Sequence, residues 1–253
     1  MTANGVVIYD GPSLLDGSAI IVVVTGIENN SSNSKTGTML QTWILMRDID
    51  PREANKSGAD VGVCGNCPLR GIPHNDPTKT LAKERACFVT IFQAPLIVWK
   101  TYQKGGYDHA KGHSAIADIG KDRRVRLGSY GDPASVPAYI WDSLLFQAEG
   151  HTGYSHQSNL PQSSFDPQIT MLSADSLEQA EDAWSNNIRT FRVINTVAEL
   201  QQDKEILCPA SKEAGKRTTC KKCLLCSGSA IEAKSIAIVA HGNGAKYANA
   251  NVA

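Results

Sequence analysis

The stretch Arg124-Val-Arg-Leu-Gly-Ser-Tyr-Gly-Asp-Pro133 carries the pattern that decides the fold. Residues 125–129 read as a β-strand, and the Gly-Asp-Pro sequence that follows is typical of a turn. Residues 135–149 have apolar side chains near helical spacing, which predicts a helix. The stretch therefore predicts one strand–turn–helix unit.

Similar units follow toward the C-terminus. Repeated strand–helix units imply a parallel sheet covered by helices, so the predicted fold class is α/β. A partial (β/α)-barrel-like sheet and a doubly wound sheet both fit, and we favour the partial barrel. The further strands are expected at 151–156, 168–172, 190–194, 205–208 and 235–241, and the further helices at 173–184 and 199–204.

The part of the chain before residue 60 reads differently. Residues 5–9, 19–25 and 39–46 are predicted strands rich in β-branched side chains, and Asp50-Pro51 begins a short helix. We therefore expect residues 1–60 to form a strand-rich N-terminal segment packed on the main domain. Residues 61–253 would form an α/β metal-binding domain with cysteine-rich loops.

Composition restricts the partners and the compartment. The 253 residues include 25 basic and 25 acidic side chains, which give a net charge of zero. A global electrostatic attraction to nucleic acid or to an anionic membrane is therefore not expected. We see neither a signal peptide nor an apolar run long enough to cross a bilayer, and expect a cytoplasmic protein without a membrane partner. In a reducing cytoplasm, closely spaced cysteines are expected to bind metal rather than to form disulfides.

The C-terminal cysteine set consists of Cys208, which precedes a proline, and the run Cys220-x2-Cys223-x2-Cys226. Three cysteines at steps of three with a remote fourth match the ligand pattern of a 4Fe–4S cluster. Four thiolates also suit tetrahedral zinc, although zinc sites more often use two separated Cys-x2-Cys pairs. We expect an iron–sulfur cluster in preference to zinc. The surrounding lysines would offset the negative charge of the thiolates, or alternatively contact phosphate.

The N-terminal cysteine set consists of Cys64, Cys67 and Cys87. Gly65 is expected to allow the tight turn that two chelating thiolates require. A fourth ligand would be His74, a cysteine of the other set, water or a substrate. A metal with an open position would be catalytic, whereas a zinc ion completed by His74 would be structural.

Several polar residues follow predicted strands, where parallel sheets collect functional groups. Ser129 and Gly131 are expected to bind a cofactor, and Asp132 to bind a substrate amine or hydroxyl or simply to cap a helix. In the next strand, alternation places Tyr154 and His156 on one face and His151 on the other. We select Asp132, Tyr154, His156 and Asp175 as catalytic candidates, with His156 as a proton carrier.

Taken in order, these motifs resemble a cysteine-rich family of proteins from tailed bacteriophages and their bacterial hosts. The resemblance implies a phage-encoded protein in the host cytoplasm and carries no activity with it. A fainter similarity, to radical enzymes built on partial (β/α) barrels, implies S-adenosylmethionine as a candidate cofactor. However, the chain has no Cys-x3-Cys-x2-Cys run. The family resemblance rests on VCGNCPLR (63–70), RVRLGSYGDPA (124–134), GHTGYSH (150–156), CPAS (208–211) and the C-x2-C-x2-C run.

Our leading hypothesis is a metal-dependent enzyme acting on a nucleotide or nucleic acid. In it, Cys64, Cys67 and Cys87 would hold the reactive centre and the C-terminal set a structural one. The alternative is a non-catalytic module in which metal stabilises a surface that binds DNA or a host protein. The sequence leaves open the metal, the substrate, the reaction and the oligomeric state.

Overall fold

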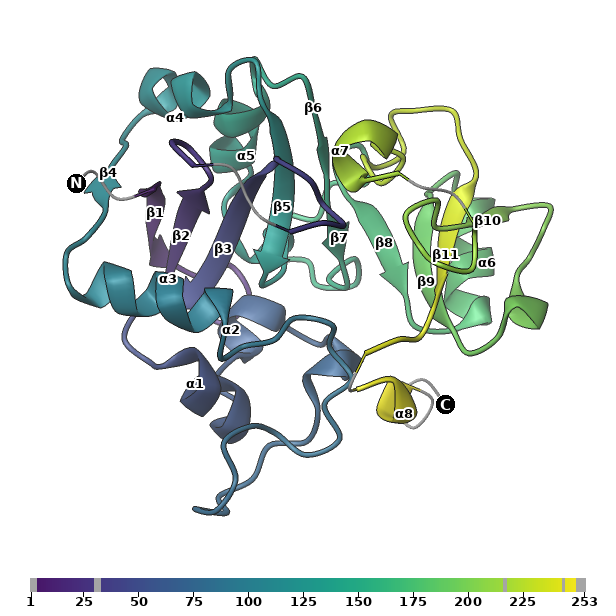
Figure 1. Cartoon of the computed structure of the whole chain (residues 1–253), viewed down its shortest axis with the longest axis horizontal. Helices are drawn as coiled ribbons and strands as arrows, with labels where there is room; N and C mark the ends of the chain where they lie inside the picture. Colours follow the sequence, from purple (N-terminus) through teal and green to yellow (C-terminus); the bar gives the residue numbers. More distant parts are fainter. Residues whose placement is uncertain (1–3, 30–32, 216–217, 243, 249–253) are drawn as a thin grey trace.

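The strand expected at 125–129 is β5 (Arg124–Tyr130) in a computed structural model that describes residues 4–29, 33–215, 218–242 and 244–248 (Figure 1). It lies between β3 (Leu40–Met46) and β6 (Gly150–Thr152) and is parallel to both. These strands belong to a six-stranded sheet in the order β4-β1-β2-β3-β5-β6. The remaining strands of this sheet are β1 (Gly5–Pro12), β2 (Ala19–Thr25) and β4 (Asp108–His109).

The first sheet is mixed, and β2 is one of its two central strands. β2 is antiparallel to both β1 and β3. The side chains of residues 20–24 have no exposed surface, because both faces of this central strand are covered. Since β3 pairs with β5, the sheet contains strands from both sides of residue 60. The division into a 1–60 segment and a 61–253 domain stays a prediction.

The second sheet is entirely parallel, in the order β10-β11-β9-β8-β7. Strand β11, which lies between β10 and β9, is an apolar run that is buried from Ser235 to Ile238, as expected for a strand with both faces covered. The strands are β7 (Tyr154–Ser155), β8 (Met171–Ala174), β9 (Thr190–Ile194), β10 (Glu205–Leu207) and β11 (Ser235–Val239).

The two sheets are joined where the chain passes from β6 to β7 through Gly153. A side chain at Gly153 would crowd Thr170 and Leu127, and its amide donates to the carbonyl of Cys226 at 2.9 Å. One predicted strand at 151–156 is thus divided between two sheets. The α/β class is confirmed by these sheets and the helices between their strands, while the partial-barrel arrangement stays a prediction.

Helices and short 3-10 turns connect the strands. Helix α3 packs against α1 and β3, α4 against α5, and α6 against β8 and β9. Within the described residues, no helix combines the length and hydrophobicity needed to cross a bilayer. The helices are α1 (Pro51–Ser57), α2 (Val61–Cys64), α3 (Ala94–Gln103), α4 (His113–Gly120), α5 (Ala138–Leu145), α6 (Leu177–Ser185), α7 (Cys220–Cys223) and α8 (Ala245–Ala248); the 3-10 turns are η1 (Pro68–Arg70), η2 (Pro133–Ser135) and η3 (Val197–Glu199).

Three predicted helices differ from the observed ones, each because of a local cap. The helix expected at 135–149 is replaced by η2, which Asp132 caps, and by the shorter α5 after Pro137. The helix expected at 173–184 begins only after Ser176, whose side chain accepts a hydrogen bond from the Gln179 amide. The helix expected at 199–204 is wrong, since a capping box at Thr196 begins η3 earlier.

Candidate functional site

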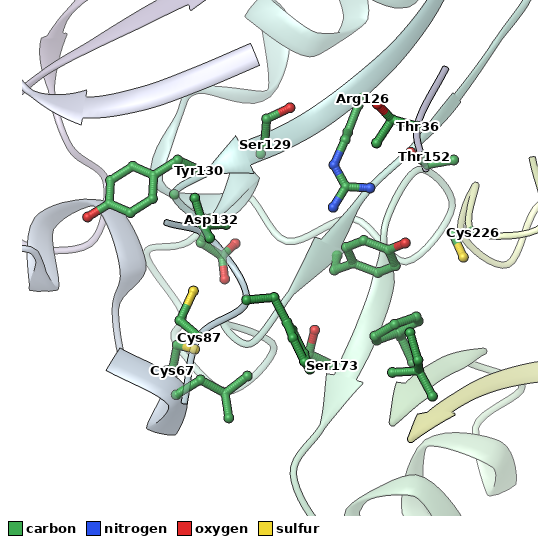
Figure 2. A pocket seen from close by; sticks show the side chains of 18 of the residues that line it. Thr36, Cys67, Cys87, Arg126, Ser129, Tyr130, Asp132, Thr152, Ser173 and Cys226 are labelled. Carbon is green, nitrogen blue, oxygen red and sulfur yellow. The ribbon is translucent and has the colours of Figure 1, made fainter. Parts of the chain in front are cut away.

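A cavity of about 480 Å³ is lined by all seven cysteines and by every residue selected for catalysis or cofactor binding. Its walls come from the later parts of β5, β8 and β11, from β6, β7 and β9, and from both cysteine loops. Figure 2 shows Cys67 and Cys87 on one side and Cys226 on the other, with Arg126 and Asp132 between them. The lining includes Cys64, Cys67, Cys87, Ser129, Gly131, Asp132, Tyr154, His156, Asp175, Cys208, Cys220, Cys223 and Cys226.

The N-terminal cysteine loop is held in a tight turn. Cys64 ends α2, and Gly65 follows it with φ of 54°, the left-handed region that favours glycine. Cys67 then precedes η1, whose Leu69 carbonyl accepts the Cys87 amide at 2.9 Å. The turn expected at Gly65 is confirmed, and the Leu69 contact brings the distant Cys87 to the Cys-x2-Cys loop.

A buried ion pair holds this loop in place. Arg70 forms an ion pair with Asp60, whose side chain is 2% exposed. The Arg70 guanidinium also donates to the carbonyls of Gly65 at 2.6 Å and Gly58 at 2.9 Å. Because the Arg70 guanidinium bonds to the Asp60 carboxylate and to both carbonyls, it holds the backbone that carries Cys64 and Cys67 in place.

The thiols of this set influence one another. Burial raises the pKa of the Cys64 thiol well above its ordinary value, and the neighbouring Asp60, Cys67 and Cys87 raise that pKa further. Burial likewise raises the pKa of Cys87. Such thiols stay neutral unless a cation is near, because a thiolate in this setting lacks solvation.

The C-terminal cysteine set is assembled from two segments. Cys208 follows β10, and its amide donates to the carbonyl of Ala237 in β11 at 2.8 Å. Cys220 and Cys223 begin and end α7, after which Leu224 turns the chain with φ of 52°. Burial, with Cys208, Cys220 and Cys223 nearby, raises the pKa of Cys226 to about 12.

A single arginine anchors the loop that carries Cys226. Arg189 is 7% exposed, and its guanidinium donates to four backbone carbonyls of this loop. Peptide carbonyls buried without donors would destabilise the loop, so Arg189 substitutes for regular secondary structure here. The acceptors are Leu225 at 2.8 Å, Gly228 at 2.6 Å, Ala233 at 2.8 Å and Lys234 at 2.8 Å.

All seven cysteines are free thiols. Across the described residues, no three or more histidine, cysteine, aspartate or glutamate side chains form a group that could hold a metal ion. His74, one candidate for a fourth ligand, is not among the residues that line the cavity, and its two ring nitrogens contact the Leu81 carbonyl and the Asp76 amide. The histidine that lies beside the N-terminal set is His156.

His156 is held from two sides. Its Nδ1 lies 3.1 Å from Oδ2 of Asp175, and its amide donates to Asp132 at 2.8 Å. Burial lowers the pKa of His156, but interactions with Cys67 and Asp175 outweigh burial and raise that pKa well above its ordinary value. With Nδ1 engaged by Asp175, the other ring nitrogen is the one available to Cys67.

Asp132 has a positioning role. Its carboxylate accepts the amides of Ala134 at 3.0 Å and His156 at 2.8 Å and the side-chain amide of Gln157 at 3.2 Å. Burial raises the pKa of Asp132, and the hydrogen bonds from the His156 and Ala134 amides partly offset that effect. The cap that the Asp-Pro sequence predicted is present, and the same carboxylate links β7 to the cysteine loop through Gln157, which also donates to the Cys64 carbonyl at 3.0 Å.

The two candidate cofactor-binding residues, Ser129 and Gly131, are each in contact with another residue of the protein. The Ser129 hydroxyl donates to Gln41 at 2.8 Å. Gly131 has φ of 82°, and a side chain there would collide with Ile44. Both residues line the cavity, but these contacts give each a structural reason to be present.

Four polar residues of the cavity were not selected as site residues from the sequence. Arg126 lies 5.4 Å from the centre of the Tyr154 ring. Three buried polar groups of the cavity have no hydrogen-bond partner within the described part of the chain: the Tyr130 hydroxyl, the Thr152 hydroxyl and Nε of Arg85. The alternation of Arg124 and Arg126 was visible in the sequence, but the lack of partners is a property of the folded chain.

Comparisons with family models, curated proteins and solved structures found no match for this chain.

Proposed function

We propose that the protein is a metal-dependent enzyme whose substrate binds in the cavity between the two cysteine sets. The observation that carries this proposal is that both sets and the polar residues at the strand ends line the same cavity. A metal that only stabilised a loop would not need to lie in the same cavity as His156, Asp175 and Arg126. A shared cavity is the arrangement in which metal and side chains act on one bound molecule.

The buried thiols support metal binding. Burial raises the pKa values of Cys64, Cys87 and Cys208, and burial brings that of Cys226 to about 12. A metal ion or an iron–sulfur cluster removes this penalty, because it binds thiolates and offsets their charge. The Cys-x2-Cys-x2-Cys run favours a 4Fe–4S cluster over zinc at the C-terminal set.

The N-terminal set is the proposed reactive centre, and His156 is the residue placed to act there. Histidines that bind metal usually donate their second ring N–H to a carboxylate, which fixes the tautomer. Asp175 stands in that position, 3.1 Å from Nδ1 of His156. His156 would serve either as the fourth ligand or as a proton carrier beside the metal.

The proposed substrate is a nucleotide or another small anionic molecule. Three cationic side chains, Lys35, Arg85 and Arg126, line the cavity and take part in none of the ion pairs found among the described residues. Arginine matches the oxygens of phosphate and carboxylate groups with paired donors. A wholly apolar or cationic substrate would leave these charges without partners.

Oxygen-free purification followed by elemental analysis tests the metal proposal. A brown protein that absorbs near ~400 nm would carry iron–sulfur, whereas a colourless protein with bound zinc would carry the alternative metal. Cys67→Ser and Cys223→Ser should each remove the metal of one set and leave the other, with Ser129→Ala as a control in the same cavity. A protein without either metal, in which both serine variants behave as the wild type, would overturn the proposal.

His156→Asn then separates the two roles of the histidine. Loss of metal from the N-terminal set would identify a ligand. Retention of that metal, with loss of turnover of a cavity-bound substrate, would identify a proton carrier. If neither metal content nor turnover changes, His156 has no part in the chemistry.

A further inference from the structure

Arg126 and Thr152 form one corner of the cavity. They are register partners on the neighbouring parallel strands β5 and β6, and both line the cavity. Figure 2 shows the Arg126 guanidinium extending into the open space, with Thr152 beside it. Partners on adjacent strands present their side chains on the same face of a sheet, so a single bound group can contact both.

The charge of Arg126 lacks an acidic partner. No ion pair in the part of the chain that the structure describes involves Arg126. Its guanidinium lies over the Tyr154 ring, and Cys220 and Cys226 are its other electrostatic neighbours. A partly buried guanidinium with five donors is stabilised most by a planar or tetrahedral anion that accepts two hydrogen bonds at once.

The Thr152 hydroxyl is a second and independent indication. Thr152 is 1% exposed, and its Oγ1 has no hydrogen-bond partner among the residues that the structure describes. A buried hydroxyl without a partner destabilises a folded protein, because it has lost its hydrogen bonds to water. An oxygen of a bound ligand at this corner would accept from Thr152 and remove that cost.

We propose that Arg126 and Thr152 form a subsite for an anionic group of the substrate, a phosphate or a carboxylate. The subsite deepens the proposed function and rests on it only in taking the cavity as the place where substrate binds. Arg126 supplies the paired charged donors, Thr152 a single hydroxyl donor. The rest of the substrate would extend toward His156 and the N-terminal cysteine set.

A competing role for Arg126 makes a different prediction. If the guanidinium only offset the charge of Cys220 and Cys226 thiolates, its removal would weaken metal binding by the C-terminal set and would not depend on any added anion. Metal content and anion affinity must therefore be measured on the same preparations.

The test is calorimetric titration of the full-length protein with inorganic phosphate and acetate, and with adenosine monophosphate against adenosine. We expect at least one of the two anions to bind, and adenosine monophosphate to bind more tightly than adenosine if the group is a phosphate. Arg126→Gln should weaken binding about 10-fold or more, since hydrogen bonds to charged groups are the strong ones. Thr152→Val should weaken binding several-fold, and Thr152→Ser should retain it.

Arg47→Gln removes the same charge from an exposed arginine outside the cavity lining and should leave affinity unchanged. Arg126→Lys, which keeps the charge but not the paired donors, should fall between wild type and Arg126→Gln. If Arg126→Gln does not fold, Arg126→Lys and Thr152→Val still decide the question.

Three results would overturn the subsite: no binding of either anion by wild type, equal affinity in wild type and the Arg126 variants, or loss of metal from Arg126→Gln with unchanged anion affinity. Failure of the metal proposal is distinguishable. A protein without metal that still binds anions through Arg126 would keep the subsite, and a metal-loaded protein that binds neither anion would lose only the subsite.

Discussion

Nδ1 of His156 lies 3.1 Å from Oδ2 of Asp175, although the two residues are 19 positions apart in the sequence. Each residue follows directly on a strand, His156 on β7 and Asp175 on β8, and these strands are parallel neighbours. Residues that directly follow adjacent parallel strands lie at the same edge of the sheet and are therefore close in space. The pair therefore depends on strand register, and the carboxylate fixes which nitrogen of the ring faces the cysteine loop.

Replacing Asp175 with alanine should lower the free energy of unfolding by about 1–2 kcal/mol, because it removes a largely buried hydrogen bond between a carboxylate and an imidazole. Urea unfolding measures this. Asp182→Ala, on the exposed side of α6, removes a carboxylate of the same charge and should change stability by less than about 0.5 kcal/mol. Equal effects of the two substitutions would show that the His156 contact adds no stability.

Gly65→Ala should destabilise the protein more than Gly17→Ala. Both glycines have positive φ, 54° and 78°, so each alanine carries backbone strain of about 1 kcal/mol. A side chain at Gly17 meets open space, whereas one at Gly65 collides with the end of the Gln157 side chain. Gln157 is fully buried, and its side chain is bonded to Asp132, to Cys64 and to the Asn66 amide, so its displacement breaks at least two hydrogen bonds.

We expect a difference of about 2 kcal/mol between these two alanine variants in equilibrium unfolding, about 1 kcal/mol for each hydrogen bond lost. If both variants lost the same free energy of unfolding, Gln157 would be able to move without loss of stability. The hydrogen bonds that link the cysteine loop to Asp132 would then contribute little to stability.

Much of the site was predictable because it depends on strand ends. The strand pattern placed Asp132, His156 and Asp175 after β5, β7 and β8, and parallel strands deliver such residues to one edge. The cysteine spacing likewise predicted the turn at Gly65. Helix boundaries were less predictable, because a cap such as Ser176 competes with the apolar pattern that precedes it.

The convergence of the two cysteine sets could not be predicted. It follows from the passage between sheets at Gly153, whose amide binds the Cys226 carbonyl, and no sequence pattern marks that residue as a crossing point. For a related reason, Arg126 was noted only as one of two alternating arginines and Thr152 was not selected. Arginine and threonine are common in strands with alternating polar and apolar residues. Only the folded chain reveals that the Thr152 hydroxyl has no partner among the described residues.

Arg189→Met should unfold the loop that holds Cys226 or lower overall stability by about 3 kcal/mol. Methionine keeps the unbranched apolar stem of the side chain but leaves four buried or partly buried carbonyls without their arginine donors. Cys226 is 8% exposed in the intact loop and should become more reactive toward a thiol reagent in the variant. Arg47→Gln is the control, and unchanged Cys226 protection in Arg189→Met would contradict the anchoring role.

Asp50 should stabilise the start of α1 in a way that depends on pH. Its carboxylate accepts the Arg52 amide at 2.8 Å and pairs with the Arg52 guanidinium at 2.7 Å. The Arg52 side chain is the main cause that lowers the pKa of Asp50, against the opposing effect of burial. A carboxylate with a lowered pKa in the folded state adds stability above its unfolded pKa, near ~3.9, and that stability is lost as the pH falls through the folded value.

Asp50→Asn separates the cap from the charge. Asparagine caps a helix about as well as aspartate, so the variant should lose only the charged part of the interaction, a few tenths of a kcal/mol for a pair this exposed. Asp50→Ala should lose about 1 kcal/mol at every pH. The difference between wild type and Asp50→Asn should be constant from pH 5 to 8, in the range above about 4 where the carboxylate is charged in both states, and should close below it. A difference that persists at low pH would assign the effect to shape rather than to charge.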